Sequence, residues 1–579
     1  MENIEIAGVL EDVAVLLQIE GANPFRIRAY QNAARTVDEH TTPLRLLVQE
    51  DADLTELPGI GKDLAASIRE LVTTGKLMLL DELSARIPYS LVELTRLPGV
   101  GPKKARRLWE ALDVRTIDDL ERVAADGAVA ELDGFGARSQ QKILDGIHAY
   151  RRHRDRMSLS EAEQHVEPLL AYLQEHGAVE RLEVAGSYRR RRETIGDIDL
   201  LAIASDTASV MERFRSYPQV ERVEVSGDTK TTVVLRSGLQ VDLRVLPAAS
   251  YGAALQYFTG SKEHNVRLRK RAVAHGLTVS EYGVFRADDD RDAEDRTPVA
   301  GREEEDVYEA LGLAWIPPEL REDRGEIDAA ATGALPRLVT LGDIRGDLQM
   351  HSTWSDGKHS IEQMLEACAS RGYEYFAITD HSKALAMTGG LDATRLRQQW
   401  VEIDEIRSRH DVIHVLRGME VDILRDGSLD LEDELLAELD VVLVSVHSLL
   451  DLPAATQTAR IVAALEHPAV NILAHPTGRL INRRDPMQLD VDTVLQAAAE
   501  HNVVVELNAH PDRLDLKDTH LIRAKQLGLR VVISTDAHRA ADLDLMRFGI
   551  DQARRAGLTP DDIINTLPLD RLRALLGRQ

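Results

Sequence analysis

From about Gly346 to the C-terminus, short apolar segments alternate with stretches of helical periodicity. The apolar segments are YFAIT, VVLVSVH, VNILAH, NVVVELN and RVVIST, and each has the length and composition of a strand. Alternation of strands with helices is typical of a parallel α/β barrel or sheet. The pattern therefore predicts such a fold here, with active-site residues at the carboxyl ends of the strands.

The rest of the chain has two other patterns. Up to about Arg154 the periodicity is helical and is interrupted only by Pro and Gly turns. Between Val179 and Val245 the strands LEVAGS, IDLLAIA, TTVVLRS and LQVDLRVL surround an amphipathic helix at VMERFRSY, which predicts an α+β unit. With 579 residues, the chain is long enough for about four domains.

Composition limits the class of protein and the kind of metal site. The chain is 44% apolar and 29% charged, which is typical of a globular protein. Its first residues, MENIEIAGVLEDVAVLL, carry acids where a signal peptide is positive, and no apolar stretch approaches 18 residues, so a cytoplasmic protein is expected. Cys368 is the sole cysteine, so a metal would be held by His, Asp and Glu.

Basic residues are concentrated in three runs, although the net charge is −27. A negative average argues against a phosphate-rich partner, because Lys and Arg supply most nonspecific affinity for nucleic acid. The runs are AYRRHRDR (Ala149 to Arg156), YRRRR (Tyr188 to Arg192) and VRLRKR (Val266 to Arg271). They are interpreted either as a basic cleft on an acidic body or as solvated helix faces.

Two segments form an internal repeat, LPGIGKDLAASI (Leu57 to Ile68) and LPGVGPKKARRL (Leu97 to Leu108). Glycines allow the backbone to approach a phosphate, and the N–H groups at the next helix start can donate to it without reading a base. One such turn could be an ordinary helix C-cap, but two copies favour DNA binding. The candidate DNA-binding residues are Gly59, Gly61, Lys62, Gly99, Gly101, Lys103 and Lys104.

These segments, and a more degenerate third at Asp133 to Ile143, resemble helix-hairpin-helix motifs. The resemblance implies that backbone carbonyls around the turns hold Na⁺ or K⁺. Those carbonyls belong to Thr55, Leu57, Ile60, Thr95, Leu97 and Val100.

A carboxylate triad is the first candidate catalytic site. Asp197 and Asp199 are separated by one residue on a predicted strand, so their side chains point to the same face. Asp242 lies on another predicted strand, and pairing of the two strands would bring the three carboxylates together. Such a site could hold two Mg²⁺ ions, one activating a 3′-hydroxyl and one steadying a triphosphate.

The segments around the triad identify a family. GSYRR (Gly186 to Arg190) and Gly196 give a GS…GDID arrangement that resembles the nucleotidyltransferase superfamily. YFTGSKEHNVRLR (Tyr257 to Arg269), with the paired hairpins, resembles the X family of DNA polymerases over residues 1 to 320. The resemblance implies the roles set out next.

By that resemblance Asp197 and Asp199 bind both metals, and Asp242 binds the catalytic metal and receives the primer proton. Ser187 and Arg190 would hold the triphosphate, while Tyr257, Phe258 and Gly260 would line the sugar pocket. Lys262 would face the incoming nucleotide, and Asn265 and Arg269 would contact the minor groove.

The N-terminal segment NPFRIRAYQNAARTV (Asn23 to Val37) looks like the family's domain that holds the 5′-phosphate of a gap, with Arg26 and Tyr30 as candidates. One residue departs from the family pattern. Ser67 stands where animal relatives carry the lysine that forms a Schiff base with a 5′-deoxyribose phosphate, and Lys62 is off register. Because serine cannot form that imine, the resemblance does not extend to lyase activity, which stays an open question.

The C-terminal region is rich in histidines and acids at the ends of predicted strands. Imidazoles mixed with carboxylates suit Mn²⁺, Zn²⁺ or Fe²⁺, which can activate water for attack on phosphorus. A single histidine after a strand is usually a core residue, but six such strand-end motifs in one domain favour a metal cluster. The candidate ligands are His351, Asp356, His381, Glu420, His447, His475, Asp536 and His538.

This region resembles the polymerase and histidinol phosphatase (PHP) family over residues 340 to 579, which implies a distorted TIM-like barrel and a bacterial or archaeal polymerase. Gln349 is a further candidate ligand, although the family more often has a histidine there. Because a glutamine oxygen is a weaker ligand, one metal position is expected to be poorly occupied and hydrolysis to be slow or absent. Seven histidines are expected to be structural or at the surface: His359, His410, His414, His467, His501, His510 and His520.

Together these features predict six consecutive segments. They are a helical DNA-end-binding domain (1–85), a fingers-like helical domain (86–157), a palm (158–247), a thumb (248–321), a linker (322–345) and a PHP domain (346–579).

The predicted function is a DNA-directed DNA polymerase that fills short gaps in base excision repair, with a PHP 3′-5′ exonuclease that could also act as an AP endonuclease. Gapped or primed double-stranded DNA and dNTPs are the expected partners, for a nucleoid-associated monomer that does not bind membranes. Two alternatives stay open. One is a non-templated nucleotidyltransferase or a PHP phosphatase acting on a small molecule, and the other is a non-enzymatic DNA-binding scaffold.

Overall fold

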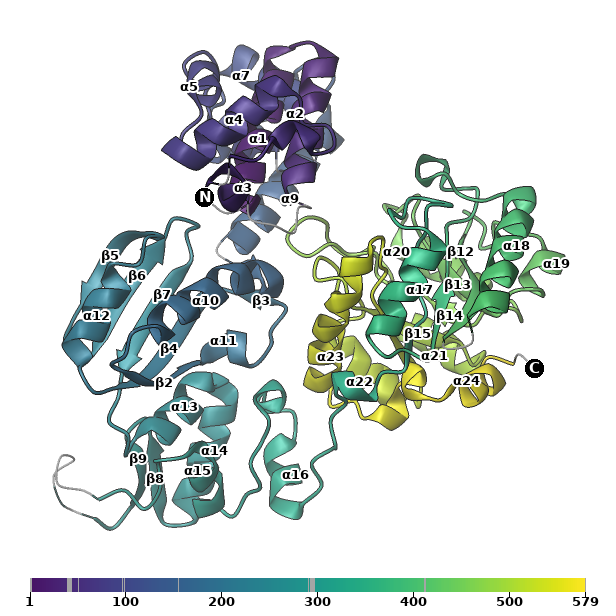
Figure 1. The fold of residues 1–579 in the computed structure, drawn as a ribbon. Coiled ribbons are helices and arrows are strands. Elements are labelled where there is room, and N and C mark those ends of the chain that lie inside the picture. Colours follow the sequence, from purple (N-terminus) through teal and green to yellow (C-terminus); the bar gives the residue numbers. More distant parts are fainter. Residues whose placement is uncertain are drawn as a thin grey trace. The chain divides into compact units, whose positions relative to one another are not determined.

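The structure is a computed structural model (Figure 1). It describes residues 3–38, 44–49, 51–95, 97, 99–154, 156–289, 291, 297–410 and 413–577. The chain divides into two compact units, Met1–Asp155 and Arg156–Gln579, and each is described by itself. Of the predicted basic run at 149–156, the side chains of residues 149–155 lie outside what the structure describes.

The first unit is helical, and the described residues of this unit include no strand, as predicted. Its apolar side chains form one core that draws on residues from Ile6 to Ile147. The elements are α1 (Asn3–Glu20), α2 (Pro24–Asp38), α3 (Leu44–Gln49), the 3₁₀ turn η1 (Leu54–Glu56), α4 (Lys62–Thr74), α5 (Met78–Ser84), α6 (Leu91–Thr95), α7 (Pro102–Leu112), α8 (Ile117–Ala125) and α9 (Ala137–Arg154).

The repeated LPGxG segments have matching backbone geometry. Gly59 and Gly99 have φ angles of 75° and 85°, a region that glycine enters without strain. Gly61 and Gly101 are the N-caps of α4 and α7, and neither cap forms a side-chain hydrogen bond. The first N–H groups of both helices are therefore left without a side-chain cap, which is the arrangement the phosphate-binding prediction requires.

The second unit begins with a five-stranded sheet in the order β2-β4-β7-β6-β5. Its strands are β2 (Val179–Val184), β4 (Asp197–Ala204), β5 (Val220–Ser226), β6 (Lys230–Leu235) and β7 (Gln240–Val245). Alternate residues of β4, Ile198, Leu200 and Ala202, pack with apolar side chains of α10 (Leu159–Gln174) and α12 (Thr207–Arg215). Because strand side chains alternate, Asp197 and Asp199 point to the opposite face.

A smaller helical part with one hairpin follows the sheet. It comprises α13 (Tyr251–Thr259), α14 (Lys262–Ala274), β8 (Leu277–Ser280), β9 (Gly283–Arg286), α15 (Glu304–Ala310), η2 (Pro318–Leu320) and α16 (Glu326–Thr332). Its apolar core also contains buried charged groups. Glu304 is 3% exposed and pairs with Arg321 at 2.5 Å and with Arg189 at 2.7 Å, so its charge is balanced twice.

The C-terminal part is a barrel-like sheet of seven parallel strands in chain order. The strands are β10 (Gly346–Asp347), β11 (Tyr375–Ile378), β12 (His414–Asp422), β13 (Val441–Ser445), β14 (Ile472–Leu473), β15 (Val504–Asn508) and β16 (Val531–Ser534). A parallel bridge between Met350 and Ala537 joins the first strand's end to the last strand's end. The predicted α/β barrel and all five predicted strands are confirmed.

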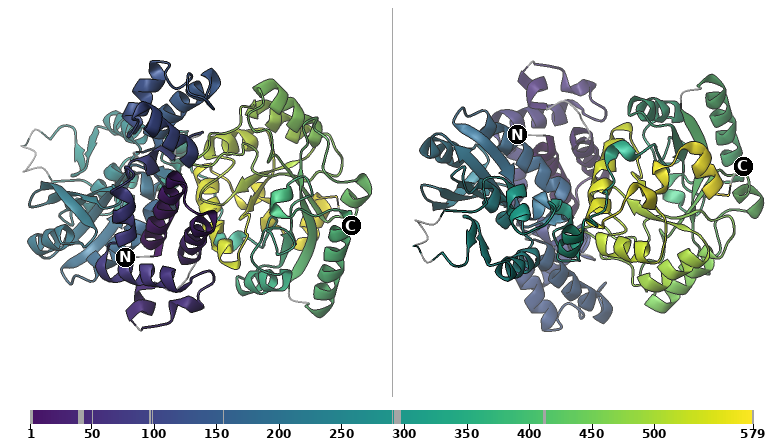
Figure 2. Two further views of the ribbon diagram at one scale, coloured as in Figure 1. Left: turned by 90° about the horizontal axis from the view of Figure 1, so that it is seen from above. Right: turned by 90° about the horizontal axis from the view of Figure 1, so that it is seen from below.

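Helices surround the strands of this barrel (Figures 1 and 2). They are α17 (Ile361–Ser370), α18 (Ala393–Arg409), α19 (Asp433–Leu436), α20 (Ala454–Leu465), α21 (Val491–Glu500), α22 (Asp518–Gln526), α23 (Met546–Arg555) and α24 (Leu569–Leu575). Phe376 and Ile378 belong to a large core shared with these helices, whereas Tyr375 and Ala377 belong to a smaller inner core. This alternation along β11 is the two-sided burial expected of a barrel strand.

Residues 322–345, predicted as a linker, are partly packed against their neighbours. They contain α16 and the 3₁₀ turn η3 (Leu341–Asp343), and Ile327 and Ala330 join the core of the α13–α15 region. Glu326 binds His264 at 2.6 Å. The Ala, Gly and charge content that suggested a linker instead encodes a short helix whose apolar face is buried. Among the described helices, none has the length and apolar character needed to cross a membrane.

Candidate active sites

A pocket of about 520 Å³ gathers most of the predicted nucleotide-binding residues. From the sheet side it is lined by Gly186, Ser187, Arg190, Asp197 and Asp199, and from α13 and α14 by Tyr257, Phe258, Gly260, Lys262, Asn265 and Arg269. Arg156 and Arg192, which the sequence placed in basic runs but not in this site, also line it. Gly196 and Asp242 were predicted for the site but do not line this pocket.

The two predicted carboxylate strands are direct neighbours. β4 and β7 pair in parallel, with Asp199 opposite Asp242 and Asp197 opposite Gln240. One oxygen of Asp242 lies 2.9 Å from the Lys230 ammonium, while its other oxygen is buried without a hydrogen-bond partner. The strand pairing thus brings the triad together, and Lys230 supplies a cation that sequence reasoning did not find.

Negative charge is concentrated at Asp199. Burial and the charges of Asp197 and Asp242 together raise the pKa of Asp199 to about 6, although Arg244 and Lys230 lower it. Gly186 lies so close that a Cβ there would stand 3.0 Å from Asp199 Oδ2. A glycine at this position lets the GSYRR backbone approach the carboxylates.

The arginines of the predicted basic run at 188–192 are neutralised by acids distant in sequence. Arg189 pairs with Glu304 at 2.7 Å, and Arg191 pairs with Glu163 at 2.9 Å. Glu322 pairs with two of them, Arg190 at 3.2 Å and Arg192 at 3.5 Å. The run is therefore neither a solvated face nor a bare basic cleft.

Residues of α13 and α14 predicted to line the sugar pocket and contact the minor groove are linked by hydrogen bonds. Asn265 donates to the Tyr257 carbonyl at 2.7 Å and accepts from Gln256 at 2.7 Å. Tyr257 and Phe258 meet edge to face at 5.2 Å between ring centroids. These contacts fix the Tyr257–Phe258 end of α13 on one wall of the pocket.

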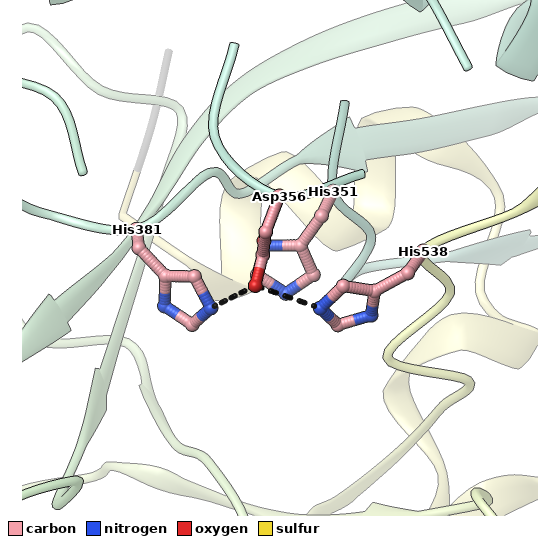
Figure 3. A group of neighbouring side chains, drawn as sticks. All are labelled: His351, Asp356, His381 and His538. Atoms are coloured by element: carbon pink, nitrogen blue, oxygen red, sulfur yellow. Dashed lines mark ion pairs between the residues drawn. The ribbon is translucent and has the colours of Figure 1, made fainter. Parts of the chain in front are cut away.

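In the barrel, the predicted histidines and acids gather at the carboxyl ends of the strands. Figure 3 shows the Asp356 carboxylate pointing between the rings of His381 and His538. Its Oδ2 atom lies 3.7 Å from His381 Nε2 and 3.5 Å from His538 Nε2, and its Oδ1 atom lies 3.9 Å from His351 Nδ1. These four residues offer ligand atoms that all lie within 4.8 Å of one another.

Glu420 stands at the centre of the remaining ligands. Its Oε2 atom lies 3.4 Å from both His351 and His381, and its Oε1 atom lies 3.3 Å from His447 and 2.8 Å from His475. Two further compact groups thus exist among the described residues, His381–Glu420–His447 and His351–Glu420–Asp536. The triad Asp197–Asp199–Asp242 does not form so compact a group in the described chain.

Several buried polar atoms of this cluster have no hydrogen-bond partner. They include Glu420 Oε2 and one ring nitrogen each of His351, His381 and His475. Gln349 is fully buried, and neither its oxygen nor its nitrogen has a partner. Because unsatisfied buried polar atoms are costly, this donor set fits bound metal ions.

Burial and neighbouring charges move pKa values within the cluster in opposite directions. Burial lowers the pKa of His381 to about 4, so its ring is neutral and able to bind a metal at pH 7. Burial also disfavours the charged form of His538, but the hydrogen bond to Asp356 and the charge of Asp536 outweigh it and raise the pKa to about 9. Metal binding at His538 would therefore release a proton.

Sequence reasoning missed a second set of residues around the cluster. Asn508 donates to Asp536 at 3.1 Å, Arg513 lies 3.6 Å from the same carboxylate, and Glu506 accepts the backbone N–H of His475 at 2.6 Å. Glu506 and Asn508 lie in the strand segment NVVVELN, so their position in a strand was the available signal. None of the seven histidines predicted as structural or surface residues belongs to a compact ligand group of the described chain.

The N-terminal candidates are less uniform. Arg26 is exposed, whereas Tyr30 is 7% exposed and contributes to the core of the first unit. Lys62 and Lys103 are exposed at the starts of α4 and α7. Lys104 donates to the Gly99 carbonyl at 3.0 Å and lies 5.2 Å from the Phe135 ring of the third hairpin, which ties two hairpins together.

Family models match four segments of the chain. They are a helix-hairpin-helix domain (residues 1–77), a SAM-like helix-hairpin-helix tandem (91–149), a DNA polymerase beta thumb (254–322) and a PHP domain (347–510).

Curated relatives agree with these matches. DNA polymerase/3′-5′ exonuclease PolX of Bacillus subtilis (strain 168) is 38% identical, and the alignment covers 100% of both chains. DNA polymerase lambda of Rattus norvegicus is 25% identical over 55% of this chain and 56% of its own length. The probable phosphatase Teth514_1060 of Thermoanaerobacter sp. (strain X514) is 25% identical over 38% of this chain and 89% of its own length. The chain belongs to the PolX family, the X-family DNA polymerases that carry a C-terminal PHP domain.

Proposed function

We propose that this DNA polymerase fills short gaps during DNA repair at the pocket between β4 and α14, and that its PHP domain is a metal-dependent 3′-5′ exonuclease. The observation that carries the proposal is the pocket itself. It unites Ser187 and Arg190 with Asp197 and Asp199 on one side and with Tyr257 to Arg269 on the other. A triphosphate, a pair of cations and a sugar can thus be held together in one cavity.

The residues of the polymerase site fit the Mg²⁺ ions that such a reaction uses. Carboxylate oxygens are the ligands that Mg²⁺ prefers, and one buried oxygen of Asp242 has no other partner. Asp197, Asp199 and Asp242 would hold the ions, which when bound neutralise the triphosphate and activate the primer hydroxyl. Ser187 and Arg190 would orient the triphosphate, and Asp242 would accept the primer proton.

The PHP cluster fits Mn²⁺ or Zn²⁺, since it mixes imidazole with carboxylate. His351, Asp356, His381, Glu420, His447, His475, Asp536 and His538 would hold these ions, with Gln349 as a weak ligand. When bound, the ions activate water for attack on a phosphodiester. Arg513 is placed to attract the phosphate, and Asn508 orients Asp536 through its hydrogen bond.

The hairpins supply the DNA-binding part of the proposal. Gly59, Gly61, Gly99 and Gly101 would admit a phosphate to the helix starts without reading sequence. The carbonyls of Thr55, Leu57, Ile60, Thr95, Leu97 and Val100 would hold Na⁺ or K⁺, and Arg26 would bind the 5′-phosphate.

The domain ranges 1–85, 86–157, 158–247, 248–321, 322–345 and 346–579 stay our assignment, with 322–345 as a packed connection. Monomeric state and nucleoid association stay predictions.

Gapped and ungapped DNA distinguish this function from its competitors. We expect the protein to extend the primer of a one-nucleotide gap and, with Mn²⁺, to shorten a 3′ end. Asp197→Ala with Asp199→Ala should abolish the first activity only. Equal incorporation with and without a template would instead favour a non-templated transferase, and turnover of a small phosphomonoester alone would favour a phosphatase.

A further inference from the structure

The triphosphate loop of the polymerase site is held from outside by the PHP domain. The side chain of Arg555, at the end of α23, donates to the carbonyl of Arg190 at 2.6 Å. Gln552, one turn earlier on α23, donates to the carbonyl of Arg191 at 2.9 Å. Two consecutive carbonyls of the loop that follows Ser187 are thus bound by side chains more than 350 residues away in sequence.

The same arginine shares an acid with the Arg190 side chain. One oxygen of Glu322 lies 3.2 Å from Arg190 Nε and 3.0 Å from Arg555 Nη1. The other oxygen of Glu322 lies 3.5 Å from Arg192. Arg555 therefore offsets part of the negative charge that would otherwise hold the Arg190 guanidinium away from a phosphate.

Arg555 is itself fixed, so it can act as a support. It is 4% exposed, and its second terminal nitrogen donates to Asp518 at 2.8 Å. A further contact at the loop's far end joins Arg479 of the barrel to Glu193 at 2.7 Å. Phe548 of α23 and Leu514 of the barrel are fully or almost fully buried in the core of the polymerase sheet. The helix that carries Arg555 is thus anchored to the sheet that carries the loop.

We propose that Arg555 and Gln552 of the PHP domain are positioning residues of the polymerase reaction, which hold the Arg190–Arg191 backbone so that Ser187 and Arg190 face the triphosphate. The inference rests on the proposed triphosphate role of Ser187 and Arg190. It assigns the PHP domain a part in nucleotide binding that is independent of hydrolysis. Loss of either hydrogen bond releases a carbonyl of the loop, and small displacements of positioned groups weaken binding strongly.

The test measures gap filling by Arg555→Met, which keeps the length of the side chain but removes its charge and donors. We expect KM for dNTP to rise at least about fivefold, as for loss of a charge-assisted hydrogen bond. kcat should change by less than about threefold, because the metal-binding carboxylates are untouched. Arg555→Lys, which keeps one donor, should recover part of the loss. Arg523→Met is the matched control, because Arg523 is a half-exposed arginine of α22 that pairs with Asp492, and it should leave KM unchanged.

Mn²⁺-dependent exonuclease activity of each variant reports whether the barrel is folded. If Arg555→Met is poorly folded, Gln552→Leu serves as the test variant. It removes one neutral hydrogen-bond donor and should still raise KM about two- to threefold. Unchanged KM in folded Arg555→Met or in Gln552→Leu would overturn the inference. Arg190→Ala distinguishes failure of the proposed triphosphate site from failure of the positioning role. If Arg190→Ala also leaves KM unchanged, the proposed triphosphate site is wrong. If Arg190→Ala is the one variant that raises KM, the triphosphate site stands and the positioning role is wrong.

Discussion

The ammonium group of Lys230, on β6, lies 2.9 Å from Oδ2 of Asp242, on the neighbouring strand β7. The lysine thus occupies one oxygen of the carboxylate proposed to accept the primer proton, while the other oxygen is buried without a partner. A side-chain cation and a metal ion would compete for this carboxylate. We therefore expect Lys230 to influence how readily the polymerase site takes up its ions.

Lys230→Met should make the polymerase site easier to load with Mg²⁺. Removal of a competing, partly exposed ion pair is worth up to about 1 kcal/mol, so the half-saturating Mg²⁺ concentration in gap filling should fall about two- to fivefold. A Mg²⁺ titration at fixed dNTP measures this, with the exposed Lys270→Met as control. A higher Mg²⁺ requirement would show instead that Lys230 holds Asp242 in its binding position.

Glu420→Gln should empty the PHP metal cluster. Glu420 contacts four histidines within 3.4 Å, and an amide removes the negative charge that balances bound cations. We expect bound Mn²⁺ or Zn²⁺, measured by elemental analysis after desalting, to fall at least tenfold, roughly the loss known for disturbed metal sites. Glu366→Gln, which changes an exposed acid on α17, is the control. Full metal content in Glu420→Gln would contradict the assigned cluster.

Glu304→Gln should cost stability at neutral pH and less at low pH. Burial disfavours the charge of Glu304, but Arg321 and Arg189 outweigh burial and hold its pKa at about 2, against 4.5 ordinarily. A carboxyl whose folded-state pKa is lowered stabilises the fold above its unfolded pKa and loses that contribution as pH falls toward the folded value. The contribution is about 3 kcal/mol at pH 7.

Urea unfolding of both proteins between pH 7 and pH 2 tests this expectation. The difference in unfolding free energy should stay constant down to about pH 4.5 and then shrink toward pH 2. A difference that does not change across this range would show that the Arg321 pair does not depend on ionisation of Glu304.

Lys62→Gln and Lys103→Gln should weaken binding to DNA without changing sequence preference. Both lysines are exposed at the starts of hairpin helices, where they would contact phosphates. Each lost contact should reduce the slope of log affinity against log salt by about one. Titrations of gapped duplex at several salt concentrations measure the slope, with exposed Lys76→Gln as control. A slope equal to that of wild type would exclude the hairpins from the DNA interface.

Most of the fold could be predicted from local patterns. The strands of the barrel are apolar runs of ordinary strand length, and the repeated LPGxG turns place glycines where the backbone needs positive φ. The region 322–345 could not be predicted in the same way. Ile327 and Ala330 of α16 are buried only because residues of α14 and α15 provide a core for them, and no local pattern records that partner.

The candidate sites divide along the same line. Ligands such as His381 and His447 were predictable because each follows a recognisable strand, and strand ends converge in a barrel. Lys230, Glu322 and Arg513 could not be predicted. A charged residue has the same local sequence pattern whether it faces solvent or pairs with a residue of another element. The basic run at 188–192 shows the same limit, since Glu163, Glu304 and Glu322 neutralise it from three distant segments.

Phe548 and Leu514 belong to the C-terminal barrel domain, but their side chains are part of the core of the polymerase sheet. A chain truncated before the barrel would lose these side chains from the core and expose a hydrophobic surface on the remaining polymerase part. Such a surface favours aggregation. Deletion of the barrel is therefore a poor way to separate synthesis from degradation in this protein, and point substitutions are preferable.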